Sequence, residues 1–438
     1  MPTLNVSDFS CLKEATFTLS RVNIIIGPQG SGKSVTTKLF YFFTDILSNC
    51  MQYAERGQSL EEVKRQLSKQ FVLWFPPQAW GPGRFNITYS ANLFSVRILR
   101  KKKAMQVSDE VTIKFSDWFT GFYEDMLESY EQSKPDDADL NLQVSAAIDR
   151  QWRTREIISR RLTGALGPDY LTQQTFIPAG RAFFTSIGRL VAGFEQAGSL
   201  DPVTVKFARL FANLRDRNAH RSTLRTSRLG EEAAARRTSF MDKLFGGEIK
   251  FENDTEFVET PDGRKIPFTA LSSGQQELLP MWSLMDYFIE LDAMAGDRTS
   301  RRLRHELVYI EEPEAHLFPS AQSLLMEFLI GSIVSERSRR SLIITTHSPY
   351  IMSKLNLFLK AGQIARRKKR NSEVNEVIPR NCWLNVSQLT ALSISDGQLT
   401  SLIDDEGLID GCYLDSISED LSKDFTKLLM IENEISNV

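Results

Sequence analysis

The sequence predicts an α/β fold with a mostly parallel sheet, an antiparallel β lobe and a large helical insertion. Three observations lead to this prediction. Residues 23–40 form an apolar run that breaks into a glycine-rich loop and resumes at helical spacing. Residues 84–115 alternate apolar and polar side chains, as strands do, and from residue 275 onward helical and strand patterns alternate. Such alternation is typical of a parallel sheet covered by helices.

The first half of the chain begins with strands and continues with helices. Residues 3–26 contain two alternating runs and then a buried apolar run, which indicates a hairpin leading into a strand that ends at Ile26. A helix over about 34–50 is expected after the glycine loop. Between 117 and 167, and again between 182 and 245, apolar residues recur at helical spacing, which predicts amphipathic helices.

The second half completes the predicted organisation. Residues 247–268 indicate a strand pair with a turn, and the runs "ELVYI" and "SLIITT" are each expected to form a strand followed by a helix. Residues 366–376 are expected to be an exposed connector. The predicted segments are the first part of an α/β head, a mainly helical insertion, the second part of the head, and a connector with an acidic tail that is a candidate partner-docking segment: 1–104, 105–246, 247–365 and 366–438.

The composition is that of an ordinary globular protein. With 438 residues, 42% hydrophobic and 25% charged, the chain is long enough for several packed units. The net charge of −2 neither supports nor excludes a nucleic-acid partner, because basic clusters at 100–103, 301–304 and 366–370 coexist with the acidic tail. The four cysteines form no CxxC pair, which argues against a zinc site. Neither a signal peptide nor an apolar run of about 18 residues is present, so we expect a cytoplasmic protein without a membrane partner.

The glycine loop satisfies the pattern GxxxxGK[ST], with a strand before it and a helix after it. Its glycines allow successive backbone N–H groups to surround a β-phosphate, and the helix N-terminus adds partial positive charge. The lysine reaches the β and γ oxygens, and the final serine ligates Mg²⁺. The sequence therefore predicts ATP and Mg²⁺ as cofactors, bound by Gly27, Gln29, Gly30, Ser31, Gly32, Lys33, Ser34 and Val35.

Two further strand ends carry residues that suit this chemistry. "LVYIEEPE" ends a strand in two glutamates: we expect Glu311 at the metal, together with Ser34, and Glu312 in position to activate the attacking water. "LIITTHSPY" ends another strand at His347, which can reach a γ-phosphate from the carboxyl edge of the sheet. Glu312 and His347 are thus the predicted catalytic residues, and Ser34 and Glu311 the predicted metal ligands.

A serine loop, "ALSSGQQE" at 270–277, precedes an apparent helix and offers a second anion-binding helix terminus. One chain rarely needs two such termini on one phosphate. Two copies arranged head to tail would use both, because each phosphate loop would be closed by the serine loop of the partner. The sequence therefore predicts a homodimer or higher homo-oligomer, with four residues acting in trans: Ser272, Ser273, Gly274 and Gln275.

In this order, "GPQGSGKS", "LSSGQQE", "YIEEPEAHLFP" and "TTHSPY" resemble the phosphate loop, signature, Walker B with D-loop, and switch histidine of ABC-type ATPases. More narrowly, they resemble the branch that includes RecF, SMC-like heads, the OLD family and the ATPase subunits of bacterial antiphage systems such as Septu and PARIS, although Phe318 stands where a second histidine is common. The resemblance implies a P-loop NTPase fold of ABC-ATPase type with ATP held between two heads. "TFIPAGR" resembles a segment near the Q-loop of this branch, which makes Gln173, Gln174 and Arg181 weaker candidates for γ-phosphate or metal contact.

The spacing of the motifs distinguishes between several candidate functions. Lys33 and Ser272 lie 239 positions apart, which leaves room for an added domain that transporter ATPases lack. The 91 residues after His347 lack the strand-end DxD expected of an OLD-type nuclease domain. We therefore expect an ATPase that serves as sensor or scaffold of an antiphage defence system and controls a separate effector, a nuclease or a toxin. A RecF-like or SMC-like ATPase of DNA repair or recombination is the alternative.

The arginine-rich segment 215–237 leaves DNA open as a partner. Its arginines could follow a phosphate backbone. They could equally lie on an exposed amphipathic helix and pair with Glu231 and Glu232. No sustained heptad pattern appears in the chain, which favours the defence function over the repair function.

Overall fold

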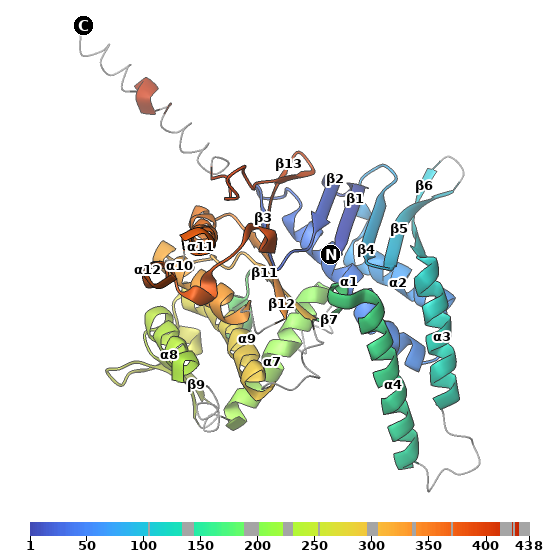
Figure 1. Cartoon of the computed structure of the whole chain (residues 1–438), viewed down its shortest axis with the longest axis horizontal. Coiled ribbons are helices and arrows are strands. Elements are labelled where there is room, and N and C mark those ends of the chain that lie inside the picture. The colour runs from blue at the N-terminus through green and yellow to red at the C-terminus, as the bar shows by residue number, and fades with distance from the viewer. Residues whose placement is uncertain are drawn as a thin grey trace.

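The computed structural model describes residues 1–103, 106–133, 144–187, 201–221, 231–252, 255–295, 305–334, 339–368, 371–411, 423 and 425–428 (Figure 1). They form one eleven-stranded sheet, a separate three-stranded sheet and the surrounding helices. None of the helices in this part of the chain has the length and apolar character that a membrane span requires.

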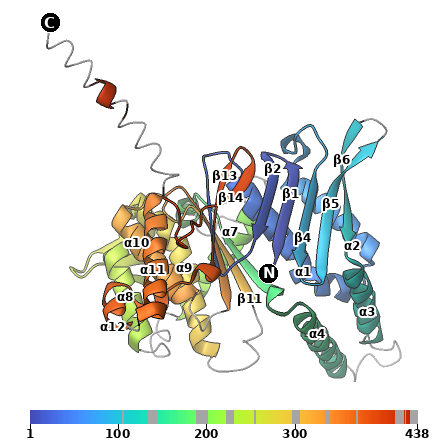
Figure 2. The same ribbon diagram turned by 45° about the horizontal axis from the view of Figure 1, so that its top comes forward.

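The large sheet joins a parallel half to an antiparallel half (Figure 2). Strands β13, β3, β12, β11 and β7 pair in parallel, whereas β6, β5, β4, β1 and β2 pair antiparallel. The predicted α/β fold with an antiparallel β lobe is therefore confirmed. In the order in which they lie in the sheet, the strands are β6 (Gln106–Phe115), β5 (Phe94–Lys103), β4 (Asn86–Ala91), β1 (Thr3–Phe9), β2 (Leu12–Thr18), β14 (Gln398–Ser401), β13 (Leu389–Ser395), β3 (Val22–Ile26), β12 (Arg340–Thr346), β11 (His305–Glu311) and β7 (Leu171–Ile177).

Two groups of helices accompany the two halves of the sheet (Figures 1 and 2). The antiparallel half carries α2 (Leu60–Trp74), α3 (Asp117–Ser133) and α4 (Val144–Leu166), and α1 (Lys33–Glu55) packs against strands of both halves. The parallel half carries α8 (Glu231–Phe245), α9 (Ser273–Ala295), α10 (Pro319–Phe328), α11 (Pro349–Lys368) and α12 (Asn371–Val377). The remaining elements are α5 (Ala182–Ile187), α7 (Pro202–Arg221) and the small sheet of β8 (Glu248–Glu252), β9 (Thr255–Glu259) and β10 (Lys265–Pro267).

Strand β11 illustrates how the parallel half is buried on both faces. Leu307 and Tyr309 belong to an apolar cluster that includes α1, whereas Val308 and Ile310 belong to a second cluster that includes α9, α10 and α11. Side chains alternate between the two faces of a strand, so a strand covered on both faces reads as a continuous apolar run. This is why "LVYI" could be identified as a buried strand from the sequence.

The segment predicted as a mainly helical insertion, 105–246, contains two strands of the large sheet as well. β6 extends the antiparallel half, and β7 pairs in parallel with β11 at the opposite edge. Between them, α3 and α4 form a hairpin that projects from the head (Figure 1). The insertion is therefore partly integrated into the head.

The residues after 365 also contribute to the head. The expected connector, 366–376, is largely helical where it is described, since α11 continues to Lys368 and α12 begins at Asn371. Strand β13 pairs in parallel with β3, and its hairpin with β14 inserts between β3 and β2. Residues 389–401 are thus neither connector nor tail, because β13 and β14 pair with strands of the large sheet and most side chains of β13 are buried. Most of the acidic tail beyond residue 411 lies outside the described residues.

Candidate functional site

The phosphate loop joins β3 to α1 and leaves its tip accessible. Residues 28–30 are exposed, as is Ser34 in the first turn of the helix. The Lys33 ammonium lies inside the loop, where Nζ donates hydrogen bonds to the carbonyl oxygens of Gly27 at 2.7 Å and Pro28 at 2.9 Å. The loop therefore has the exposed tip and inward-facing cation that phosphate binding requires.

Strand β13 supports this loop from behind. The carbonyl oxygen of Ile394 lies 2.7 Å from the position that a Cβ on Gly27 would occupy. Any larger side chain at Gly27 would push the loop away from β13, so the first glycine of the motif is required for packing as well as for phosphate binding. This contact cannot be foreseen from the sequence, because Gly27 and Ile394 lie 367 positions apart.

Three parallel strands bring the predicted motifs to one edge of the sheet. β3, β12 and β11 are neighbours in that order, and the pairs Ile26–Thr346 and Thr345–Glu311 set their carboxyl ends level. Neighbouring strands lie about 4.8 Å apart. The phosphate loop, His347 and the two glutamates therefore follow adjacent strand ends, as the sequence predicted.

The acidic strand end combines a buried carboxylate with a more exposed one. Glu311 is buried: Oε2 accepts a hydrogen bond from the Ala179 N–H at 3.4 Å, and Oε1 has no hydrogen-bond partner among the described residues. The Glu312 side chain is 40% exposed, and its backbone φ of 43° lies in the left-handed region that few residues other than glycine adopt. Burial lowers the pKa of Lys33, while the charges of Glu312, Glu314 and Glu311 oppose this shift, so these carboxylates act on the phosphate loop.

Glu314 holds the loop that carries the switch histidine, a role that the sequence did not reveal. Its Oε1 accepts hydrogen bonds from the Thr346 hydroxyl and from the His347 backbone N–H, each at 2.7 Å. His347 Nε2 in turn lies 3.5 Å from Glu312 Oε1. The only sign of this role in the sequence is that a third glutamate follows Pro313 directly in "EEPE".

The oxygen groups at this edge suit Mg²⁺. Hard cations prefer carboxylate and hydroxyl oxygens. Glu311 offers a buried oxygen that no described residue satisfies, and Ser34 offers an exposed hydroxyl. Within the described ranges, no group of three or more His, Cys, Asp and Glu side chains could hold a metal by itself. This fits a cation that is bound through nucleotide phosphates and one or two protein ligands.

The serine loop forms the start of α9. Ser272 and Gln275 cap the helix: the Ser272 backbone N–H and hydroxyl donate to Gln275 Oε1 at 3.1 and 3.0 Å, and the Gln275 N–H donates back to the Ser272 hydroxyl at 3.4 Å. Gln275 Nε2 also donates to the Phe245 carbonyl at 3.0 Å. Ser273 is exposed at the first helical position. Ser272 and Gln275 therefore order the loop, and Ser273 with the first helical amides presents the surface for an anion.

We expect Gly274→Ala to lower ATP turnover about 10- to 100-fold, because small displacements in a catalytic site cost this much. An added Cβ would lie 2.6 Å from the His316 carbonyl oxygen, so alanine must displace the serine loop or the loop after the acidic pair. Binding of ATP to the phosphate loop should stay unchanged. Steady-state turnover and nucleotide titration measure the two effects separately.

The matched control is Gly121→Ala on α3, where an added Cβ meets nothing within 4 Å. This variant should behave as the wild type. Wild-type turnover by Gly274→Ala would show that the close contact with His316 does not position the serine loop for catalysis.

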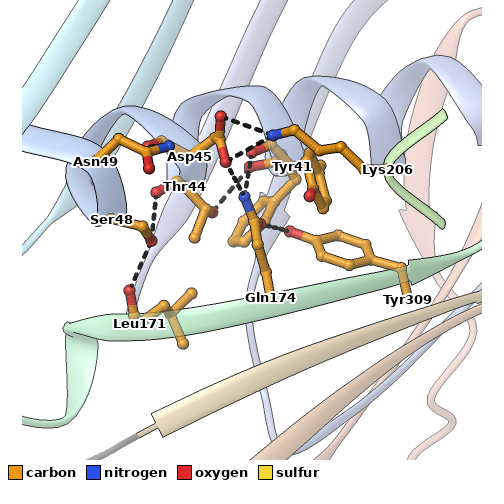
Figure 3. A network of polar contacts seen from close by, with 10 residues as sticks. Tyr41, Thr44, Asp45, Ser48, Asn49, Leu171, Gln174, Lys206 and Tyr309 are labelled. Carbon is orange, nitrogen blue, oxygen red and sulfur yellow. Dashed lines mark hydrogen bonds and ion pairs between the residues drawn. The ribbon is translucent and has the colours of Figure 1, made fainter. Parts of the chain in front are cut away.

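The two candidate glutamines lie at the amino end of β7, away from the phosphate loop. Gln173 pairs with Glu306 at the start of β11, whereas the acidic pair ends that strand. The Gln174 amide belongs to a polar network against α1, in which Nε2 donates to the Tyr41 carbonyl at 3.0 Å and to Asp45 Oδ1 at 3.3 Å (Figure 3). Asp45 follows the phosphate loop by about three helical turns. The register of β7, whose carboxyl end is at Ile177, thus places both glutamines away from the strand ends that carry the phosphate loop and the acidic pair.

Arg181 follows that carboxyl end and does reach the acidic pair, but from behind. Its side chain is completely buried, and its guanidinium donates to the backbone carbonyls of Glu311 at 2.9 Å and Glu312 at 3.2 Å. A guanidinium that is completely buried and donates to four backbone carbonyls is directed into the protein and away from a phosphate. The structure thus places Arg181 as a support of the acidic strand end.

Only part of the arginine-rich segment 215–237 lies within the described residues. Residues 222–230 and the side chains of Glu231 and Glu232 lie outside the described part of the structure. Three of the described arginines pair with acids on β9 and α9: Arg215 with Glu256, Arg217 with Glu290, and Arg237 with Asp286. Because these charges are neutralised within the chain, they do not form a free basic surface for a phosphate backbone.

A comparison with protein families finds one match to part of the chain. Residues 218–352 match the family model described as an AAA ATPase domain. The matched range includes the serine loop, both glutamates at the end of β11 and the switch histidine, and it begins after the phosphate loop. These strand ends therefore lie in a region similar to an ATPase domain. No curated protein matches the chain.

Solved structures also align with most of the chain. They include the SMC head domain from Thermotoga maritima, with 13% identity, a TM-score of 0.34 and coverage of 91% of this chain and 97% of that chain. An SMC head bound to the C-terminal winged-helix domain of ScpA aligns with 13% identity, a TM-score of 0.36 and coverage of 91% and 96%. The recombination mediator RecF aligns with 11% identity, a TM-score of 0.28 and coverage of 91% and 97%. With TM-scores this low, these likenesses carry no weight for function.

Proposed function

We propose that this chain is a Mg²⁺-dependent ATPase whose active site is completed by a second copy. The observation that carries the proposal is the convergence of the phosphate loop, the acidic pair and the switch histidine on three adjacent strand ends. The similarity of residues 218–352 to an ATPase domain supports the same chemistry.

The residues at this edge take separate roles in hydrolysis. Lys33 and the loop amides bind the β- and γ-phosphates. Ser34 and Glu311 hold Mg²⁺, which when bound neutralises charge on the phosphates. Glu312 orients the attacking water and accepts its proton, since its carboxylate is partly exposed and not held in a strong hydrogen bond. His347, which faces Glu312, contacts the γ-phosphate.

A second copy would supply the serine loop. Ser273 is exposed at the N-terminus of a 23-residue helix, where the helix dipole favours a phosphate. Two aromatic side chains next to the site, Phe318 after the acidic pair and Tyr350 after the switch histidine, are 77% and 51% exposed. Exposed aromatic side chains of this kind are commonly buried in protein interfaces. These features support a homodimer or higher homo-oligomer.

We further propose that the ATPase is the sensor or scaffold of an antiphage defence system and controls a separate nuclease or toxin. The motifs that resemble the ATPase subunits of such systems support this role. In addition, the described helices α3 and α4 have 17 and 23 residues, which corresponds to a length of about 35 Å for the longer one and is shorter than a long SMC-type coiled coil. ATP-driven association of two heads would reposition these hairpins and thereby a bound effector.

A DNA-dependent repair function is the second candidate, because α4 exposes basic residues on one side. Arg150 and Arg153 are exposed and share that side with Ile157, which is 59% exposed. Arg160 lies on the same side and pairs with Glu156. A stripe of arginines on a projecting helix can follow a phosphate backbone.

ATP turnover with and without linear double-stranded DNA at low salt distinguishes the two candidates, with Lys33→Ala as the blank. We expect slow turnover that exceeds the blank and does not respond to DNA. Strong stimulation by DNA, removed by Arg150→Glu with Arg153→Glu, would instead establish the DNA-dependent function. Turnover equal to the blank under both conditions would contradict the ATPase proposal.

A further inference from the structure

Arg181 connects two parts of the site that lie far apart in the sequence. It follows β7, and its guanidinium donates from Nε to the Glu277 carbonyl at 2.9 Å, from Nη1 to the carbonyls of Pro178 at 3.1 Å and Glu311 at 2.9 Å, and from Nη2 to the Glu312 carbonyl at 3.2 Å. Glu277 belongs to α9 and is the last residue of the serine loop, 270–277. A single side chain thus joins the start of α9 to the acidic strand end.

The charge of this connection is matched inside the protein. Glu277 is 4% exposed, and its Oε2 lies 3.7 Å from Arg181 Nε without a hydrogen bond among the described residues. Burial lowers the pKa of Arg181, and Glu277 is the first of the carboxylates that oppose this. A buried ion pair contributes little net stability compared with apolar packing, so its retention calls for another role.

The hydrogen bond from Arg181 to the Glu312 carbonyl indicates that this role is to hold the Glu312 backbone in place. Glu312 has a left-handed backbone, with φ of 43°, and its N–H donates to the Thr345 carbonyl at 2.9 Å. Such a conformation persists only where the surroundings hold it. Arg181 bonds the carbonyl and β12 bonds the N–H, so together they fix the direction of the Glu312 side chain relative to His347. A shift at the start of α9 would move Arg181 and thereby the carboxylate.

We propose that Arg181 and Glu277 are positioning residues that couple the serine loop to Glu312. The proposal rests on the proposed ATPase function. When the nucleotide of a second copy contacts the serine loop, the position of α9 is transmitted through the guanidinium to the Glu312 backbone. Hydrolysis therefore requires association of the two copies, and ATP bound by an isolated copy is not hydrolysed.

Two variants test this coupling. Arg181→Lys keeps the charge but replaces a planar fork with a single donor centre, which cannot bond all four carbonyls in the same geometry. Glu277→Gln keeps the shape of the side chain and removes its charge. It provides the test if the Arg181→Lys variant does not fold. We expect turnover at saturating ATP to fall about 10- to 100-fold in both. Nucleotide affinity and ATP-dependent association should match the wild type, as should all properties of the surface control Arg264→Lys.

The double variant Arg181→Lys with Gly274→Ala separates coupling from a merely structural role. If Arg181 and Gly274 act through the same contacts, the double variant should hydrolyse ATP no more slowly than the slower of the two single variants. Multiplied effects, unchanged turnover in Arg181→Lys and Glu277→Gln, or parallel loss of turnover and association would overturn the proposal.

Hydrogen exchange of the peptide containing Glu311 and Glu312, measured without nucleotide, gives a readout that does not depend on activity. Gly274→Ala should raise this exchange in the wild-type background and add nothing once Arg181→Lys is present. A wild type without turnover above Lys33→Ala would contradict the ATPase proposal alone. An exchange response to Gly274→Ala that persists in full with Arg181→Lys would contradict the coupling alone.

Discussion

Lys33→Ala is expected to reduce ATP affinity at least about 100-fold, equivalent to about 3 kcal/mol, and to bring turnover to background. The Lys33 ammonium is the cation enclosed by the phosphate loop, with two loop carbonyls as its present partners. With alanine at this position, only the backbone N–H dipoles of the loop stabilise the negative charge of the phosphates. Titration with a fluorescent ATP analogue, followed by a turnover assay, measures both effects.

Lys38→Ala is the matched control for this experiment. Lys38 lies on the same helix, is half-buried, and pairs with Asp201 at 3.4 Å, outside the phosphate loop. Its loss removes one positive charge from α1 without touching the loop, so ATP affinity should stay close to that of the wild type. Equal affinities in Lys33→Ala and the wild type would remove the phosphate loop from the proposed site.

The central part of the site could be predicted from the sequence because each motif is local. A strand that ends at Ile26, Glu311 or Thr346 carries its functional residues in the next few positions. The pairing of parallel strands then brings these ends together at one edge. Nothing beyond the order of strand and loop was needed, which is why the phosphate loop, the acidic pair and the switch histidine were found together.

The supporting contacts could not be predicted, because they depend on partners remote in sequence. Neither "LTALSIS" nor "TFIPAGR" shows which neighbours it meets: Ile394 packs behind Gly27, and Arg181 bonds Glu311. The position of Gln174 was hidden for a related reason. A glutamine on a strand faces the site only if it lies near the carboxyl end, and the sequence did not fix where β7 ends relative to β11.

Charge pairing was equally hidden. The sequence leaves the arginines at 215–237 open as a basic surface, because the partners of Arg215, Arg217 and Arg237 come from β9 and α9, far along the chain. The exposed arginines of α4 are not distinguished in the sequence, because Asp149 and Glu156 lie among them. Only the three-dimensional structure separates the paired charges from the exposed ones.

Glu312→Gln is expected to lower turnover about 10²- to 10⁴-fold while leaving ATP binding intact. Glutamine keeps the size of the side chain but cannot accept the proton of the attacking water. If the site is shared, ATP that is not hydrolysed holds two copies together through the partner's serine loop. The variant should therefore accumulate as a dimer or larger assembly with saturating ATP and Mg²⁺, as measured by size-exclusion chromatography with light scattering.

The double variant Glu312→Gln with Lys33→Ala supplies the control, because it lacks hydrolysis and nucleotide binding alike and should remain a monomer under the same conditions. Assembly that requires both ATP and an intact Lys33 would identify the nucleotide as the link between copies. A Glu312→Gln variant that binds ATP and stays monomeric would defeat the shared site. The serine loop at the start of α9 would then need another ligand, and the exposed Phe318 and Tyr350 another partner.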